Sequence, residues 1–577
     1  MKIKKILNEY LIKACLKEKI PHHYISSMQW TDNTKLWHYQ INGIIPVASK
    51  LKINTKILSE KIIKNINSYK IFKKIKYSSP GFINILIDEN WISKKLENIY
   101  YSTRLGIKKN VKKTVVIDYS SPNMAKEMHV GHLRSTIIGD VMARTMEFIG
   151  YQVKRMNHIG DWGIQFGMMI ALIKKKKKLY KINQLSLQDL EKFYQKSKQI
   201  YEKNIIFKKK SHQYLIELQK KNKKYIEIWK KIIEITMIEN QKIYDILNIS
   251  LKKEHILGES FYIHFLPHMI KELKKKKITN NHLGNIIVYL ENIKNKHGKP
   301  MGVILKKNDS SFLYSTIDLA CLKYRMQILK ANRIIYYTDI RQKQHLKQIE
   351  IIAKKAKYVP ENFHLEHHAF GMVLTKENKP FKTREGKPIK LKTLIKESIK
   401  KSTDIIKKKN PYLNKKKISY ISKIIGISAI KYSDLSKNRT KNYIFDWNKM
   451  LSFQGNTALY IQYTYTRICS IIKKNKLKIK KKNKKIILKK KIEIQISIKI
   501  LQFEEILEDI TNNGFPHFLC IYLFKLSSLF SIFYEKYPIL YAKKIKTKYS
   551  RIKLSVLVAK TIKLGLKLLG IHTIEKM

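Results

Sequence analysis

The order of a strand, a polar loop and a helix between residues 114 and 149 constrains the fold of this chain most strongly. The apolar run Thr114–Asp118 predicts a buried strand, and Leu133–Ile149 has the apolar spacing of a helix. In an open α/β sheet, a ligand binds in the crevice at the carboxyl end of such a strand. The free backbone N–H groups of the following helix suit a phosphate. The sequence therefore predicts a parallel sheet with a phosphate-binding loop after this strand.

Two histidines lie at the expected start of that helix, in the sequence His129-Val130-Gly131-His132. Each imidazole can donate a hydrogen bond to a phosphate oxygen. Gly131 has no side chain, which leaves room for a flat base to lie on the backbone. We interpret this segment as a site for adenylyl transfer from ATP.

The four residues 129–132 resemble the HIGH motif of class I aminoacyl-tRNA synthetases. A longer set of residues is more specific: Ser121-Pro122-Asn123, Lys126, and Leu133-Arg134-Ser135 after the second histidine. Together with the run Asn-His-Ile-Gly-Asp-Trp-Gly-Ile-Gln-Phe-Gly at 157–167, it resembles the arginyl-tRNA synthetases of the bacterial type. The resemblance extends over essentially the whole chain.

This resemblance implies ATP-dependent activation of L-arginine to arginyl-adenylate and its transfer to the 3′ end of tRNA(Arg), with Mg²⁺ arriving on the ATP. His129 and His132 would stabilise the α-phosphate in the transition state. The second cationic loop of class I enzymes, K-M-S-K, is absent from the sequence. Lys382 and Arg384 lie in its degenerate counterpart and are expected to bind ATP, while Lys126 would replace the missing lysine. The alternative for Lys126 is an ordinary surface lysine.

An arginine pocket needs acidic groups for the guanidinium and polar groups for the amino-acid head. Tyr314 and Asp318 are four residues apart and so share a helical face. A carboxylate accepts two parallel N–H bonds from a guanidinium. By resemblance, the predicted arginine-binding set is Asp118, Asn123, Glu259, Tyr314, Asp318 and Gln342. Taken alone, an aspartate such as Asp318 is more often a helix cap or a surface charge, and the match to the family motif is what favours a role in binding.

The fold class expected from these patterns is α/β: a Rossmann-type parallel-sheet catalytic domain, an α+β N-terminal domain and an all-α C-terminal bundle. Residues 1–110 form the predicted N-terminal tRNA-contacting domain, with a helix at Ile3–Lys19 and a strand after the turn at Pro80-Gly81. The catalytic domain is expected at 111–390, with further strands at Val153–Asn157 and Arg333–Thr338 and a helical insertion at about 171–280. A connecting helical segment (391–454) and an anticodon-binding domain (455–577) follow.

Contacts with tRNA are expected outside the catalytic domain. By resemblance, Phe82 and Asn84 match positions that contact a D-loop base, where an aromatic ring and an amide suit a splayed base. In the C-terminal domain Tyr460, Tyr463, Arg467 and the terminal Met577 are candidates for unpaired anticodon bases. For Phe82 and for the tyrosines, simple core packing is the alternative.

The chain carries 118 Lys and Arg against 43 Asp and Glu, a formal charge of +75. Such a surface favours a polyanion, although Lys, Ile, Asn and Tyr are abundant throughout, as compositional drift would produce. The four cysteines are far apart, so we expect neither zinc nor disulfides, and a cytoplasmic location. The apolar stretch 515–534 approaches membrane-spanning length but is expected to be a buried helix, not a membrane anchor. A monomer is expected by resemblance.

Three other interpretations stay open. Another class I synthetase would share His129 and His132 but not Glu259, Tyr314 and Asp318 together. A small-molecule nucleotidyltransferase would have no use for the two flanking domains. A non-catalytic RNA-binding descendant would have no reason to keep Lys126 and Asn123 beside both histidines.

Overall fold

The computed structural model describes residues 2–20, 29–32, 37–67, 69–109, 111–175, 185–295, 297–309, 311–381, 388–474 and 485–576. The chain divides into two compact units. Unit 1 comprises Met1–Lys108, Leu451–Leu568 and His572–Met577, and unit 2 comprises Lys109–Met450 and Leu569–Ile571. The division into four domains at residues 110, 390 and 454 is finer and stays a prediction.

Unit 2 is built on a parallel sheet of four strands, in the order β11–β10–β5–β6. The strands are β5 (Thr114–Asp118), β6 (Gln152–Met156), β10 (Arg333–Tyr336) and β11 (Glu366–His367). The three predicted strands are therefore confirmed to within two residues at each end. From β5 the chain passes to β6 on one side and later to β10 and β11 on the other, so the switch point of the sheet lies between β5 and β10.

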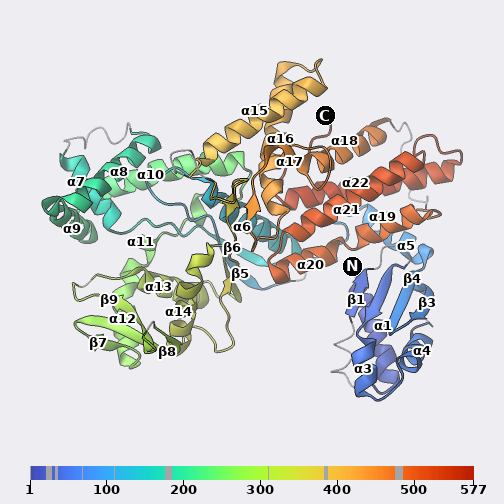
Figure 1. The fold of residues 1–577 in the computed structure, drawn as a ribbon, viewed down its shortest axis with the longest axis horizontal. Helices are drawn as coiled ribbons and strands as arrows, with labels where there is room; N and C mark the ends of the chain where they lie inside the picture. The colour runs from blue at the N-terminus through green and yellow to red at the C-terminus, as the bar shows by residue number, and fades with distance from the viewer. Residues whose placement is uncertain are drawn as a thin grey trace. The chain divides into compact units, whose positions relative to one another are not determined.

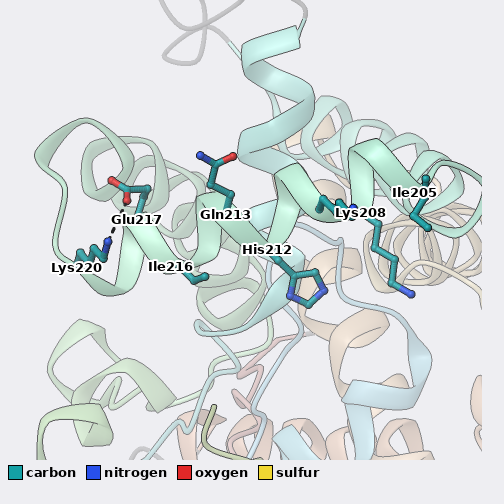
Figure 2. Close-up of a pocket in the computed structure, with 8 residues that line it drawn as sticks. Ile205, Lys208, His212, Gln213, Ile216, Glu217 and Lys220 are labelled. Atoms are coloured by element: carbon teal, nitrogen blue, oxygen red, sulfur yellow. Dashed lines mark ion pairs between the residues drawn. The ribbon is translucent and has the colours of Figure 1, made fainter. Parts of the chain in front are cut away.

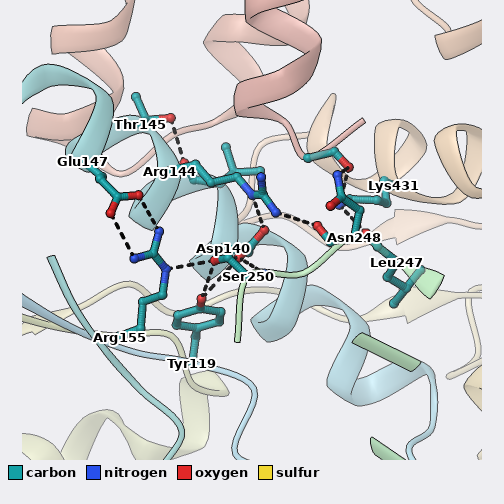
Figure 3. A network of polar contacts seen from close by, with 12 residues as sticks. Tyr119, Asp140, Arg144, Thr145, Glu147, Arg155, Leu247, Asn248, Ser250 and Lys431 are labelled. Atoms are coloured by element: carbon teal, nitrogen blue, oxygen red, sulfur yellow. Dashed lines mark hydrogen bonds and ion pairs between the residues drawn. The ribbon is translucent and has the colours of Figure 1, made fainter. Parts of the chain in front are cut away.

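Helix α6 (Val130–Ile149) follows β5 and is buried along most of its length. It carries a buried carboxylate, Asp140, which accepts from Arg144 Nε at 2.7 Å and from the backbone N–H of Ser250 at 2.8 Å (Figure 3). Burial opposes ionisation of Asp140, but Arg144 and Lys431 outweigh it and lower its pKa. Lys431 itself donates to the carbonyls of Leu247 and Gly570 at 2.7 and 2.9 Å, and burial lowers its pKa to about 7.

Four helices follow β6 first in the described residues, and they make up most of the predicted insertion: α7 (Ile164–Lys175), α8 (Leu187–Lys203), α9 (Ile205–Gln219) and α10 (Lys223–Ile246). They pack on one another, as Figure 1 shows. Their apolar core also includes Met124 and Ala125 from the loop before α6. These helices therefore support the loop that carries the two histidines, and the insertion bounds of about 171–280 stay a prediction.

A second group of elements packs on the parallel sheet: α11 (Glu259–Tyr262), η3 (Ile263–Phe265), α12 (Leu266–Lys275), α13 (Tyr314–Gln327) and α14 (Lys343–Lys355), with η2 (Lys253–His255) before it. It includes an antiparallel sheet of β7 (Asn280–His282), β8 (Asn285–Lys294) and β9 (Pro300–Lys306). The group shares one core with Val116 of β5 and Ile334 of β10. This sheet was not predicted.

The remaining elements of unit 2 follow the sheet group along the chain. They are η4 (Ile340–Gln342), β12 (Val373–Leu374), α15 (Leu391–Lys409), α16 (Lys415–Leu435), β13 (Tyr443–Ile444) and α17 (Trp447–Met450).

Unit 1 combines an antiparallel sheet with helices from both ends of the chain (Figure 1). The sheet order is β1–β2–β4–β3, from β1 (Gln29–Asp32), β2 (Tyr39–Asn42), β3 (Phe72–Ser78) and β4 (Phe82–Ile87). The N-terminal helices are α1 (Ile3–Lys17), α3 (Ile44–Lys50), α4 (Thr55–Ile66) and α5 (Glu89–Tyr100). The C-terminal helices are α18 (Ala458–Lys474), α19 (Lys491–Leu501), α20 (Phe503–Asn513), α21 (His517–Lys536) and α22 (Ile545–Leu568). The expected first helix, the strand after Pro80-Gly81 and the helical C-terminal region are all present.

Helix α21 (His517–Lys536) has the length and hydropathy of a membrane span, and it is the one such helix within the described ranges. Its apolar side chains, including Leu519, Leu523 and Phe530, are buried within unit 1. It packs against α19, α20 and α22, which agrees with the expected buried helix.

Gly139 marks the closest approach between α6 and the end of β5. A Cβ on Gly139 would overlap the side chain of Tyr119. We expect Gly139→Ala to lower the free energy of unfolding, because overpacking costs about 1–3 kcal/mol whereas alanine in a helix regains about 0.5–1 kcal/mol. Urea unfolding followed by circular dichroism measures the difference. Gly160→Ala is the control, since its Cβ would meet nothing nearer than Glu259 Oε1 at 3.9 Å; equal stability of the two variants would contradict the account.

Candidate active site

The loop between β5 and α6 holds three non-glycine residues in the left-handed region: Ser120 (φ 77°), Ser121 (φ 43°) and Ala125 (φ 56°). Such conformations are costly and persist where surrounding contacts over-determine them. The backbone N–H of Ser120 donates to Ser135 Oγ at 2.9 Å, and that of Ser121 donates to Asn157 Oδ1 at 3.0 Å.

Helix α10 of the insertion supplies two more contacts to the same loop. Tyr244 hydroxyl lies 2.7 Å from Ser120 Oγ, and Thr236 Oγ1 accepts from the backbone N–H of Ala125 at 3.2 Å. Side chains from α6, from α10 and from the end of β6 therefore fix one backbone path. Ser135 and Asn157 belong to the quoted motifs but were given no supporting role, and Thr236 and Tyr244 were missed because they lie about 100 positions further along the chain.

His129 is the N-cap of α6, and its Nδ1 accepts from the backbone N–H of Gly131 at 3.1 Å. His132 Nδ1 accepts from the backbone N–H of His129 at 3.1 Å, and the ring centroids are 3.9 Å apart. Burial is the main cause that lowers the pKa of both imidazoles, that of His132 to about 3. Both rings are therefore neutral near pH 7, and since each Nδ1 accepts, each proton is on Nε2. The pair presents two neutral N–H donors.

Gly131 has a steric role inside the motif. A Cβ there would lie 2.8 Å from His129 Cε1 and 2.9 Å from Nδ1, so the imidazole of His129 already fills this space. The backbone of Val130 donates to the carbonyl of Ile389 at 3.0 Å, and that of Leu391 donates to Met128 at 2.9 Å. These bonds fasten the start of α6 to the segment before α15. The expected contact of Gly131 with an adenine base stays a prediction.

A cavity of about 420 Å³ opens beside this loop, and it brings together several residues of the predicted set. Its lining includes Asn123, Lys126, Glu259 and Tyr314, with Trp162 and Tyr194. Lys126 Nζ lies 4.4 Å from the centre of the Tyr194 ring, a cation–π contact that holds the ammonium at the cavity wall. Residues more than 180 positions apart in the sequence therefore meet at one hollow.

Glu259 begins α11 and is the most perturbed acid of the cavity. Burial, with the negative charges of Asp318 and Asp161, raises its pKa to about 8. Asp161 fixes the segment that carries Glu259: it accepts from the backbone N–H of Ser260 at 2.9 Å and from Ser260 Oγ at 2.6 Å. A buried acid of this kind, with two acidic neighbours, is an electrostatic site for a cation.

Asp318 and Tyr314 lie on one face of α13, as their spacing predicts. Both contact His345 of α14: Asp318 Oδ2 lies 2.6 Å from His345 Nε2, and the Tyr314 ring centroid lies 4.8 Å from that of His345. His158 Nε2 is 3.7 Å from Asp318 Oδ1, which is too long for a hydrogen bond. Asp318 is therefore part of the acidic cluster with Glu259, and neither a helix cap nor an isolated surface charge.

Asp118 ends β5 as expected, but a neighbouring positive charge neutralises its carboxylate. Arg325, with a fully buried side chain, donates from Nη2 to Asp118 Oδ2 at 2.5 Å. Ser121 Oγ donates to the other oxygen at 3.3 Å. Because the buried guanidinium neutralises this carboxylate, the carboxylate attracts the ammonium group of a ligand only weakly. Its expected contact with the amino group stays a prediction.

For the remaining predicted site residues of unit 2, the structure gives fewer contacts. Gln342 ends η4 at the start of α14 and is exposed beyond the end of β10. Lys382 and Arg384 lie outside the described residues. The segment that leads to them is anchored by Arg134 of α6, a buried side chain that the sequence reasoning missed: its Nη1 donates to the carbonyl of Gly371 at 2.7 Å, and its Nε pairs with Asp434 at 3.1 Å.

In unit 1, Phe82 is half-buried at the start of β4, and Asn84 is only 4% exposed. Asn84 Oδ1 accepts from Gln40 Nε2 at 2.9 Å, and its Nδ2 donates to Ser78 Oγ at 2.9 Å. Both ends of the amide already have protein partners, so the geometry gives the amide a structural role in the sheet. The expected contact of both residues with RNA stays a prediction.

Three of the predicted anticodon-binding residues lie on α18. Tyr463 is 43% exposed, and its hydroxyl accepts from Arg467 Nη2 at 2.7 Å. The Arg467 guanidinium also lies 4.7 Å and 4.8 Å from the ring centres of Tyr463 and Tyr534. Tyr460 instead packs inward, with its ring 5.5 Å from that of Phe524 and its hydroxyl 3.3 Å from Ser531 Oγ. Met577 lies outside the described residues.

A separate open hollow of about 650 Å³ runs along α9 of the insertion. Lys208, Lys209, His212 and Lys220 line it, and they are exposed along one helix (Figure 2). Glu217 lies 3.7 Å from Lys220 on the same face. The hollow is a shallow cationic surface of a single helix and contains none of the predicted site residues.

Across the described ranges, no three or more His, Cys, Asp and Glu side chains are arranged to hold a metal ion.

Three protein-family models match the chain. The model for "tRNA synthetases class I (R), catalytic domain" matches residues 95–447. The "Arginyl tRNA synthetase N terminal domain" matches residues 1–87, and the "DALR anticodon binding domain" matches residues 461–577. The parallel sheet and the paired histidines are thus those of a class I aminoacyl-tRNA synthetase.

Comparison with individual relatives identifies the family within this class. The chain is 54% identical over 580 residues to the arginine–tRNA ligase of Buchnera aphidicola subsp. Schizaphis graminum, and the match covers 100% of both chains. It is 52% identical to that of Wigglesworthia glossinidia brevipalpis, over 94% of each. The arginyl-tRNA synthetase structure from Plasmodium falciparum matches with a TM-score of 0.86, 33% identity and 100% coverage of both chains. The Thermus thermophilus arginyl-tRNA synthetase shares the fold, with a TM-score of 0.81 at 19% identity and 100% coverage. The chain belongs to the arginine–tRNA ligase family.

The protonation state of the two histidines is directly testable. Because the pKa of His132 is about 3 in the folded protein and 6.5 ordinarily, the neutral form stabilises the fold above pH 6.5. That stabilisation is lost as pH falls from 6.5 towards 3, by up to about 1.4 kcal/mol per pH unit. Ring ¹⁵N shifts should show His132 neutral at pH 5.5 with its proton on Nε2. Titration of His132 near pH 6.5 would contradict this geometry.

Proposed function

We propose that the protein activates L-arginine with ATP to form arginyl-adenylate and then transfers the arginyl group to the 3′ end of tRNA(Arg). The observation that carries the proposal is the cavity that joins Glu259 and Asn123 to the histidine loop, with Asp318 beside it. An acidic cluster suits a guanidinium, and neutral N–H donors suit a phosphate that gains charge in the transition state. The family match over the full chain supports the same reaction.

In the first step, a carboxylate oxygen of arginine attacks the α-phosphorus of ATP and pyrophosphate leaves with the bonding electron pair. In the second, a terminal ribose hydroxyl of tRNA attacks the adenylate carbonyl, and AMP leaves. Nε2–H of His129 and of His132 would donate to the α-phosphate oxygens, and Lys126 would add a positive charge at the same cavity. Mg²⁺ would be held by the ATP phosphates, which suits its preference for oxygen ligands.

The roles that we assign to individual residues follow from where each residue lies relative to the cavity and to the loop with the two histidines. Glu259 and Asp318 would bind the guanidinium and Tyr314 would close over it, while Asn123 and Gln342 would bind the amino-acid head. Lys382 and Arg384 would bind ATP beyond the anchor that Arg134 makes to Gly371. In unit 1, the exposed Tyr463 and the half-buried Arg467 beside it are better placed than the inward Tyr460 to stack on unpaired bases. We further propose a cytoplasmic monomer whose activation step requires tRNA.

The proposed reaction is tested by arginine-dependent ATP–pyrophosphate exchange, with and without tRNA(Arg). We expect exchange in its presence, slowed about 10²–10³-fold in His132→Ala, the range seen when one transition-state donor is removed. Exchange in the absence of tRNA would support the proposed reaction but contradict its proposed dependence on tRNA. Folded protein that gives no exchange with arginine under either condition would contradict the proposed function and favour another class I substrate.

Glu259 makes arginine binding depend on pH. Its raised pKa means that the empty pocket carries a proton below pH 8, and a guanidinium needs the carboxylate form. Binding should therefore release one proton, and affinity should rise about tenfold per pH unit up to about pH 8 and then level off. Calorimetry in buffers of different ionisation enthalpy counts the proton. Glu259→Gln should bind more weakly and without this pH dependence, whereas wild-type binding that releases no proton would reject the mechanism.

A further inference from the structure

His345 is a histidine of the acidic cluster to which no role has been given so far. It lies in the first turn of α14, three residues after the end of η4, and its side chain is 13% exposed. Its Nε2 is 2.6 Å from Asp318 Oδ2. A carboxylate oxygen can only accept, so the proton of this hydrogen bond is on Nε2. His345 therefore occupies one oxygen of Asp318 and leaves the other for a ligand.

The chemistry of the donor matters in a pocket for a cation. A lysine or arginine beside Asp318 would carry a permanent positive charge and would repel a guanidinium. The same structure shows that outcome at Asp118, whose carboxylate is neutralised by Arg325 at 2.5 Å. An imidazole can orient a carboxylate by a hydrogen bond from a ring N–H and carries no permanent charge.

The surroundings of the pair suit this arrangement. His158 faces Asp318 Oδ1 from the loop after β6, but at 3.7 Å it does not occupy that oxygen. Asp161 of the same loop and the carboxyl of Glu259 of α11, which becomes charged when it loses its proton, complete the acidic surroundings. Tyr314 covers the imidazole of His345 from the start of α13. Asp318 is thus held from one side only, and its other oxygen is free of a close partner among the described residues.

We propose that His345 is a positioning residue for guanidinium recognition: it orients Asp318 by donating to Oδ2, so that Oδ1 meets the substrate side chain. The inference rests on the proposed function. It makes the choice of histidine a specificity device, because an imidazole fixes the carboxylate without the permanent positive charge that a lysine or arginine would bring to a pocket for a cation.

The test compares His345→Gln with His345→Asn in arginine-dependent pyrophosphate exchange. The glutamine amide reaches about as far as Nε2 and can donate, while the asparagine amide is too short. We expect His345→Asn to raise KM for arginine at least about tenfold, the usual effect of losing a hydrogen bond to a charged group. KM for ATP should stay within about twofold, and His345→Gln should restore KM for arginine to within about threefold of wild type.

Discrimination supplies a readout that a purely structural role would not move. Citrulline replaces the guanidinium with a neutral urea group, so the ratio of kcat/KM for arginine over citrulline should fall in His345→Asn and recover in His345→Gln. His364→Gln, at an exposed histidine, is the matched control. An unchanged KM for arginine in His345→Asn, a parallel rise in KM for ATP, or failure of His345→Gln to recover would overturn the inference alone. A wild-type enzyme that gives no exchange with arginine would overturn the proposed function as well.

Discussion

The strained loop between β5 and α6 is the constraint on which the site depends. Ser120, Ser121 and Ala125 adopt left-handed conformations there, at a combined cost of a few kcal/mol. The backbone N–H groups of these residues donate to side-chain oxygens of Ser135, Asn157 and Thr236, and these hydrogen bonds hold the backbone path. The loop ends at the N-cap of α6, where His129 and His132 accept backbone N–H bonds at Nδ1, which leaves each ring proton on Nε2. Two N–H donors are thus oriented before any substrate arrives, which is the preorganisation that the proposed stabilisation of the phosphate requires.

The acidic residues near this loop differ in whether a lysine or arginine neutralises their charge. Asp118 is offset by the buried Arg325, and Asp140 is offset by Arg144 and Lys431. Glu259 has acidic neighbours instead of a cationic partner, and the result is a raised pKa. Asp318 has a histidine partner. Asp118 joins β5 to α13, and Asp140 joins α6 to Ser250. Glu259 and Asp318 form an acidic cluster without a lysine or arginine partner, which suits a guanidinium.

Much of this could be predicted from local sequence. The apolar run at Thr114–Asp118 and the spacing of Tyr314 and Asp318 identified β5 and one face of α13, because strand and helix periodicity are local properties. The pairing of Asp118 with Arg325 could not be predicted, since 207 positions separate them and the contact forms only when α13 packs on the sheet. His345 was missed for the same reason. Asn84 illustrates the opposite case, in which the expected ligand contact competes with two hydrogen bonds inside the sheet.

The most direct test of the account is a crystal structure of the protein with a non-hydrolysable sulfamoyl analogue of arginyl-adenylate and tRNA. The account predicts the guanidinium between Glu259 and Asp318, and the sulfamoyl oxygens within hydrogen-bond distance of Nε2 of His129 and His132. It also predicts an unchanged backbone path at 120–125. A guanidinium bound away from both carboxylates, or histidines that contact the analogue through Nδ1, would contradict it.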